Sequence, residues 1–80
     1  MKLTILAFSV VKEIFNGNSI QIELPQGATS ADLKALLNSQ YPALQQLATY
    51  LIAVNSEYSS EQTIIQEGDE IAIIPPVSGG

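Results

Sequence analysis

The chain has 80 residues, a length that supports one small domain, because single domains cluster near about 100 to 150 residues. Three lysines and no arginine stand against eight carboxylates, and the net charge of -5 argues against nucleic acids and anionic membranes as partners. The absence of Cys and His excludes disulfides, thiol nucleophiles and the commonest zinc ligands and general bases, so we expect no metal site and little capacity for catalysis.

The first predicted element is a strand over residues 2–8. Alternation divides its side chains between an inner face with Leu3, Ile5 and Ala7 and an outer face with Lys2, Thr4, Leu6 and Phe8. This start resembles a signal peptide, but Lys12 and Glu13 come too soon and no small-residue cleavage site follows. No apolar run approaches the roughly 20 residues that span a bilayer, so we expect a soluble, cytoplasmic protein.

One or two helical turns over residues 9–15 are expected next. The pair Asn16-Gly17 is a strong turn signal, and the alternation over residues 19–24 is the clearest strand pattern in the chain. Pro25 and Gly27 end that strand.

The main helix is predicted over residues 30–40. Thr29 and Asp32 have the spacing of a capping box, in which each side chain satisfies a free backbone amide. The apolar stripe consists of Leu33, Leu36 and Leu37, at the spacing of one helix face. Pro42 stops the helix near Tyr41.

Helix, strand and loop patterns compete in the region between residues 42 and 66. Leu44 and Leu47 favour a short second helix within residues 42–50, residues 51–54 are a candidate buried strand, and Tyr58 begins a weakly defined stretch. Residues 67–69 then turn into a last strand over residues 70–74. Tyr41, Tyr50 and Tyr58 are expected to pack locally. The adjacent carboxylates Asp69 and Glu70 are not expected to perform acid–base chemistry, because Gly68-Asp69 is a turn and neighbouring residues of a strand point to opposite faces.

The order strand, strand, helix, strand, strand predicts an α+β domain of the β-grasp type over residues 1–74, a mixed sheet with one main helix packed on one face. Residues 75–80 would form an extended tail of Pro75, Pro76, Val77, Ser78, Gly79 and Gly80. Two prolines fix φ and cannot join a sheet, and the glycines lack a Cβ that would obstruct a narrow channel. The tail could reach about 20 Å and present its carboxylate. A simple frayed end is the alternative.

Residues 68–80, which read GDEIAIIPPVSGG, resemble the C-terminal signature of the small sulfur-carrier subunits of molybdopterin synthase. Further agreement runs along the chain in similar order, at Ala7-Phe8, residues 11–13, the helix start at residues 28–33, Tyr41-Pro42 and residues 53–55. Lys12 departs from the pattern, where an arginine is expected, and keeps the charge without bidentate hydrogen bonding.

The resemblance implies a ubiquitin-like β-grasp protein that binds no cofactor of its own. An E1-like adenylyltransferase would use ATP to adenylate the Gly80 carboxylate, which would then become a thiocarboxylate. The tail would enter a pocket of the large synthase subunit, in a hetero-oligomer (a heterotetramer), and donate sulfur to cyclic pyranopterin monophosphate. Catalytic residues would belong to the partners.

A tail of this kind is a poor anchor, because ordering Val77 to Gly80 costs roughly 4 to 8 kcal/mol. We therefore expect an apolar partner interface on the outer sheet face, formed by Leu6, Phe8, Ala72 and Ile74 with Tyr58. Scattered exposed apolar side chains, which need no explanation, are the alternative reading.

Two other functions stay open at this point. A ubiquitin-like modifier, or a sulfur carrier for thiazole or tRNA thiolation, would share the fold and the two glycines, although the stretch from Pro75 to Ser78 argues against both. An inert interaction module would have no use for its terminus.

Overall fold

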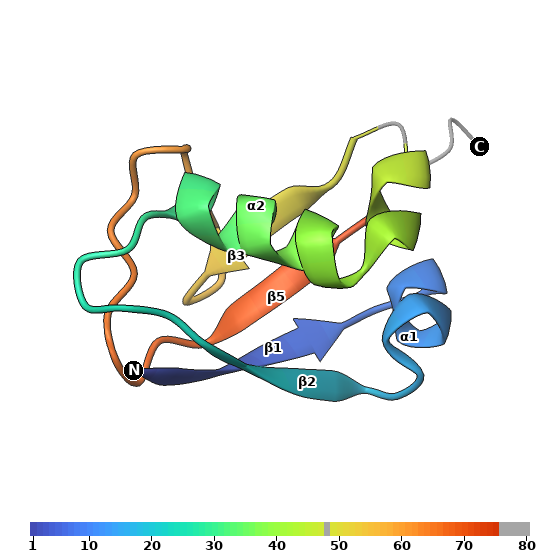
Figure 1. The fold of residues 1–80 in the computed structure, drawn as a ribbon, viewed down its shortest axis with the longest axis horizontal. Coiled ribbons are helices and arrows are strands. Elements are labelled where there is room, and N and C mark those ends of the chain that lie inside the picture. Colours follow the sequence, from blue (N-terminus) through green and yellow to red (C-terminus); the bar gives the residue numbers. More distant parts are fainter. Residues whose placement is uncertain (48, 76–80) are drawn as a thin grey trace.

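The computed structural model describes residues 1–47 and 49–75. Helix α2 lies across one face of a mixed sheet (Figure 1). The elements in chain order are β1 (Lys2–Ala7), α1 (Val10–Phe15), β2 (Ser19–Glu23), α2 (Ser30–Gln40), the 3-10 helix η1 (Pro42–Gln46), β3 (Leu51–Val54), β4 (Glu57–Tyr58) and β5 (Ile71–Ile74).

The sheet has five strands in the order β2-β1-β5-β3-β4. The central strands β1 and β5 run parallel, while the other neighbours pair antiparallel. The first and last strands of the domain therefore lie side by side, with α2 packed over them. This arrangement confirms the predicted α+β, ubiquitin-like β-grasp fold.

The core lies between the sheet and α2 and follows the predicted alternation. Leu3, Ile5 and Ala7 are all buried, whereas their neighbours on β1 are exposed or half-buried. Ile71 and Ile73 are fully buried on the same face of β5, beneath the α2 side chains Leu33 and Leu37. Leu36, the third member of the predicted stripe, packs at the margin of this core.

Both ends of α2 match the sequence prediction. The Asp32 amide donates to Thr29 Oγ1 at 3.3 Å, and the Thr29 amide donates to Asp32 Oδ2 at 2.9 Å, which completes the capping box. The helix ends at Gln40, before Tyr41 and Pro42. None of the helices among the described residues is long and apolar enough to cross a membrane.

Three features differ from the sequence prediction. Strand β4 was not expected, because its hairpin turns at Asn55 and Ser56, with φ of 54° and 71°, and lacks the glycine that usually marks such a turn. The helix after Pro42 ends at Gln46 and is a 3-10 helix. Leu51 was assigned to a buried strand and is 49% exposed, because it points to the face that α2 leaves open.

Candidate functional site

The outer face of the sheet carries a shallow depression of about 330 Å³, which we call the docking face. It is lined by Leu6, Phe8, Ala53, Ser56, Tyr58, Glu70, Ala72 and Ile74. The fold thus brings together all five residues predicted for the partner interface, which are Leu6, Phe8, Ala72, Ile74 and Tyr58. Their role in binding a partner stays a prediction.

Strand register explains the shape of the docking face. Leu6 pairs with Ala72, Ala72 with Ala53, and Ala53 with Tyr58, so one row crosses four strands. The two central alanines form a low floor between larger side chains at either end. Helix α2 covers the opposite face of the sheet (Figure 1) and does not cover this row, in which Ala53 is buried, Leu6 and Ala72 are half-buried and Tyr58 is exposed. Tyr58 is 69% exposed and Phe8 45% exposed.

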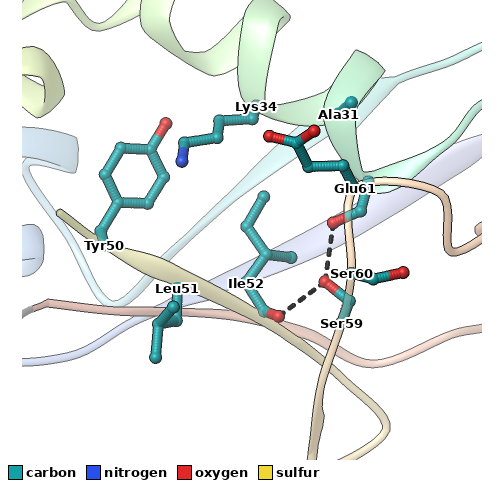
Figure 2. Close-up of a pocket in the computed structure, with 9 residues that line it drawn as sticks. Ala31, Lys34, Tyr50, Leu51, Ile52, Ser59, Ser60 and Glu61 are labelled. Atoms are coloured by element: carbon teal, nitrogen blue, oxygen red, sulfur yellow. Dashed lines mark hydrogen bonds between the residues drawn. The ribbon is translucent and has the colours of Figure 1, made fainter.

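Leu51 lies beside the docking face on the same side of the sheet as Ile74, although the sequence reasoning missed it. It pairs with Ile74, and its side chain points away from that of Ile52, as Figure 2 shows. The signal was present in the sequence, because alternation from a buried Ile52 places Leu51 and Ala53 on the other face. The docking face itself reaches the end of β5 through Ile74.

The predicted tail begins at this point. Pro75 follows Ile74 and is half-buried, while Pro76, Val77, Ser78, Gly79 and Gly80 lie outside the described residues. The division into a domain over residues 1–74 and a tail over residues 75–80 stays a prediction.

Asn55 fixes the edge of the docking face. Its Nδ2 donates to Asp69 Oδ1 at 2.9 Å, and its Oδ1 accepts from the Glu70 amide at 2.9 Å. The Asn55 amide also donates to the Glu70 carbonyl at 2.7 Å, and Asp69 Oδ2 accepts from the Gln66 amide at 2.8 Å. Asp69 therefore has a structural role in the turn before β5, as expected from the sequence.

A second hollow, of about 240 Å³, lies between α2 and β3 (Figure 2). The Ser59 hydroxyl donates to the Ile52 carbonyl at 2.8 Å, so the Ser30 hydroxyl, 2.7 Å away, is the donor between the two serines. The amide of Ser30 donates to the Thr63 carbonyl and that of Ala31 to the Glu61 carbonyl. These groups are already paired, so the hollow holds neither an activated hydroxyl nor a free anion-binding helix end.

Tyr50 borders the same hollow, and its phenol stays protonated at neutral pH. Its hydroxyl donates to Asn38 Oδ1 at 2.6 Å, and Lys34 Nζ lies 5.0 Å from the ring centroid. Burial raises the pKa of Tyr50 above its usual value of 10.0, which keeps the phenol neutral. Burial of the neutral phenol therefore stabilises the fold fully at pH values below the unfolded-state pKa of Tyr50. This stabilisation is lost as the pH rises through the folded-state pKa.

The described residues contain no group of three or more His, Cys, Asp or Glu side chains that could hold a metal ion. The candidate site is therefore the docking face, which lies beside Pro75.

The model of the ThiS family matches residues 5–80. The chain belongs to the ThiS family. It is 50% identical over 80 residues to the molybdopterin synthase sulfur carrier subunit of Dictyostelium discoideum, covering 95% of this chain and 93% of the relative. The protein of the same name from Chlamydomonas reinhardtii is 37% identical over 83 residues, with both chains fully covered.

Solved structures agree in fold. A putative molybdopterin converting factor subunit 1 from Pyrococcus furiosus superimposes with a TM-score of 0.87 at 26% identity, covering 96% of this chain and 99% of that one. Subunit 1 in a complex of the two subunits of molybdopterin-converting factor from Helicobacter pylori reaches 0.71 at 25% identity, with full coverage of both chains. SAMP1 from Haloferax volcanii, at 0.84 and 24% identity with full coverage, shares the fold.

Proposed function

We propose that this chain is the sulfur-carrier subunit of a molybdopterin synthase. An E1-like enzyme uses ATP to adenylate the Gly80 carboxylate, and a sulfur donor converts the adenylate into a thiocarboxylate. The thiocarboxylated tail then enters the large subunit and gives its one sulfur to cyclic pyranopterin monophosphate, and two such transfers build the dithiolene of molybdopterin. The family, the names of its relatives and the signature over residues 68–80 support this assignment.

The observation that carries the proposal is the position of the docking face beside the base of the tail. Ile74 lines the face and is followed directly by Pro75, where the predicted tail begins. A large subunit that covers the face would thus receive the tail in the same encounter. The Helicobacter pylori neighbour, determined as a complex of subunits 1 and 2, favours a partner of this type.

In this proposal the catalytic residues belong to the partner enzymes. This chain has no Cys or His, and the carboxylate of Asp69 and the phenol of Tyr50 are held in structural hydrogen bonds. The chain needs only a terminus that can be activated and a surface that can be recognised. We place this exchange in the cytoplasm, where the carrier would meet both enzymes.

Intact-mass spectrometry tests the proposal. The carrier is incubated with the activating enzyme, ATP and a sulfide source, and its mass is expected to rise by the difference between sulfur and oxygen. A variant with one alanine added after Gly80 keeps the whole domain and should remain unmodified. An unchanged mass of the native chain would contradict the proposal, and isopeptide adducts on cellular lysines would favour a modifier instead.

A further inference from the structure

The docking face has one charged residue at its edge. Seven of the eight residues that line the depression are uncharged, and the eighth is Glu70. Glu70 directly precedes β5, whereas Ile74 and Pro75 lie at the other end of that strand. A partner that covers the face therefore meets apolar groups near the tail and a carboxylate at the far edge.

The backbone of Glu70 is held in place on both sides. Its amide donates to Asn55 Oδ1 at 2.9 Å, and its carbonyl accepts from the Asn55 amide at 2.7 Å. This clamp fixes the point from which the exposed Glu70 side chain projects. The carboxylate is therefore presented by a rigid element rather than by a free loop.

Among the described residues, no ion pair engages the Glu70 carboxylate within 4.0 Å. Lys2 lines a neighbouring depression together with Glu70 but does not form such a pair. The carboxylate is thus available to a cation from another molecule.

The net negative charge is distributed unevenly along the chain. Residues 1–56 hold all three lysines and three carboxylates, which cancel, and the whole net charge of -5 falls within residues 57–70. The five carboxylates of this segment are Glu57, Glu61, Glu67, Asp69 and Glu70. Of these five, Glu70 alone lines the docking face.

We infer that the partner surface covering the docking face presents a lysine or arginine side chain to Glu70. This inference rests on the proposed function, in which the partner is the large synthase subunit. Covering a carboxylate with apolar groups alone would cost desolvation energy without compensation, whereas a cation restores a charge-assisted hydrogen bond. A second copy of this chain is a poor occupant, because it would bring its own acidic segment to the contact.

The test compares Glu70→Gln with Glu67→Gln in titration calorimetry against the large subunit. Both substitutions change the net charge equally, but the exposed Glu67 does not line the docking face. We expect Glu70→Gln to weaken binding about tenfold and Glu67→Gln less than twofold. Glu70→Asp, which keeps the charge, should recover part of the loss, and Glu70→Gln should also show a smaller salt dependence of Kd than Glu67→Gln.

The possible results distinguish failure of the proposed function from failure of the inferred cation opposite Glu70. If the native carrier fails to bind the large subunit at all, the proposed function is wrong. If the native carrier binds and the two Gln variants have equal Kd and equal salt dependence, the cation opposite Glu70 is refuted while the proposed function stands. Thermal unfolding of each variant shows whether the domain is intact. If Glu70→Gln is unstable, Glu70→Ala compared with Glu67→Ala removes the same charge and provides the test.

Discussion

Two asparagines of this chain occupy left-handed backbone positions, Asn16 at φ 59° and Asn55 at φ 54°. Asparagine tolerates this region better than other side chains except glycine. The two positions differ in what the side chain does. Asn16 ends α1 through its backbone, whereas the amide group of Asn55 joins the β3–β4 hairpin to Asp69 and Glu70. A residue of one type thus serves a local turn in one place and a long-range clamp in the other.

This difference predicts unequal effects of alanine. Asn16→Ala should lose only the preference of asparagine for the left-handed backbone region. Asn55→Ala should in addition lose two side-chain hydrogen bonds, so its free energy of unfolding should fall by about 1 to 3 kcal/mol more. Urea denaturation of the two variants measures the difference. Equal losses would mean that the clamp adds nothing to stability.

Helix α2 is the element that ties the two halves of the chain together. Its first amides donate to carbonyls of the segment before β5, Ser30 to Thr63 at 2.8 Å and Ala31 to Glu61 at 3.1 Å. The capping box at Thr29 satisfies the next amide, that of Asp32. The start of α2 is therefore fixed both by its own sequence and by residues about 30 positions further along the chain.

Thr29→Ala should remove the hydroxyl that accepts from the Asp32 amide. We expect the free energy of unfolding to fall by about 0.5 to 2 kcal/mol, the usual cost of losing such a cap. Thr49→Ala, at an exposed position outside the helices and strands, is the matched control and should be near neutral. A neutral Thr29→Ala would show that the contacts with the later segment are enough to hold the helix start.

At the scale of the whole molecule, the two faces of the sheet differ in what covers them. Helix α2 and the core use the inner face, and the apolar side chains left on the outer face gather around one depression beside Pro75. The net charge lies in the segment after β3, away from the first half of the chain. Folding therefore uses one face of the sheet, and the other face remains for the partner that we propose.

Phe8→Glu should weaken binding to the large subunit by at least tenfold, because it places a charge within an apolar contact. The melting temperature should change little, since Phe8 is 45% exposed. Ile64→Glu makes the same change in charge at a position that is 58% exposed and does not line the docking face. If both variants bind alike, or if Phe8→Glu unfolds the domain, the assignment of the docking face is wrong.

Much of this fold could be predicted because its signals are local. Alternation in β1 and β2 identified their faces, and the capping box with Pro42 identified the bounds of α2. The same alternation placed Leu6 and Phe8 on the open face, and the resemblance over residues 68–80 pointed to the family that the comparisons confirm.

Other features depended on contacts between distant residues. Strand β4 forms because Asn55 is held by residues 14 and 15 positions further along, and no turn glycine announces it. Leu51 is exposed because α2 covers only one face of the sheet. Alternation separates Leu51 from Ile52, but the four-residue apolar run does not indicate which of the two faces α2 covers. The sequence by itself determined β1, β2, α2 and the buried face of β1, since these follow from periodicity and from residue types at adjacent positions. Only the tertiary structure decided that Leu6, Ala72, Ala53 and Tyr58 form one row with Glu70 at its edge, because strand order and register bring them together.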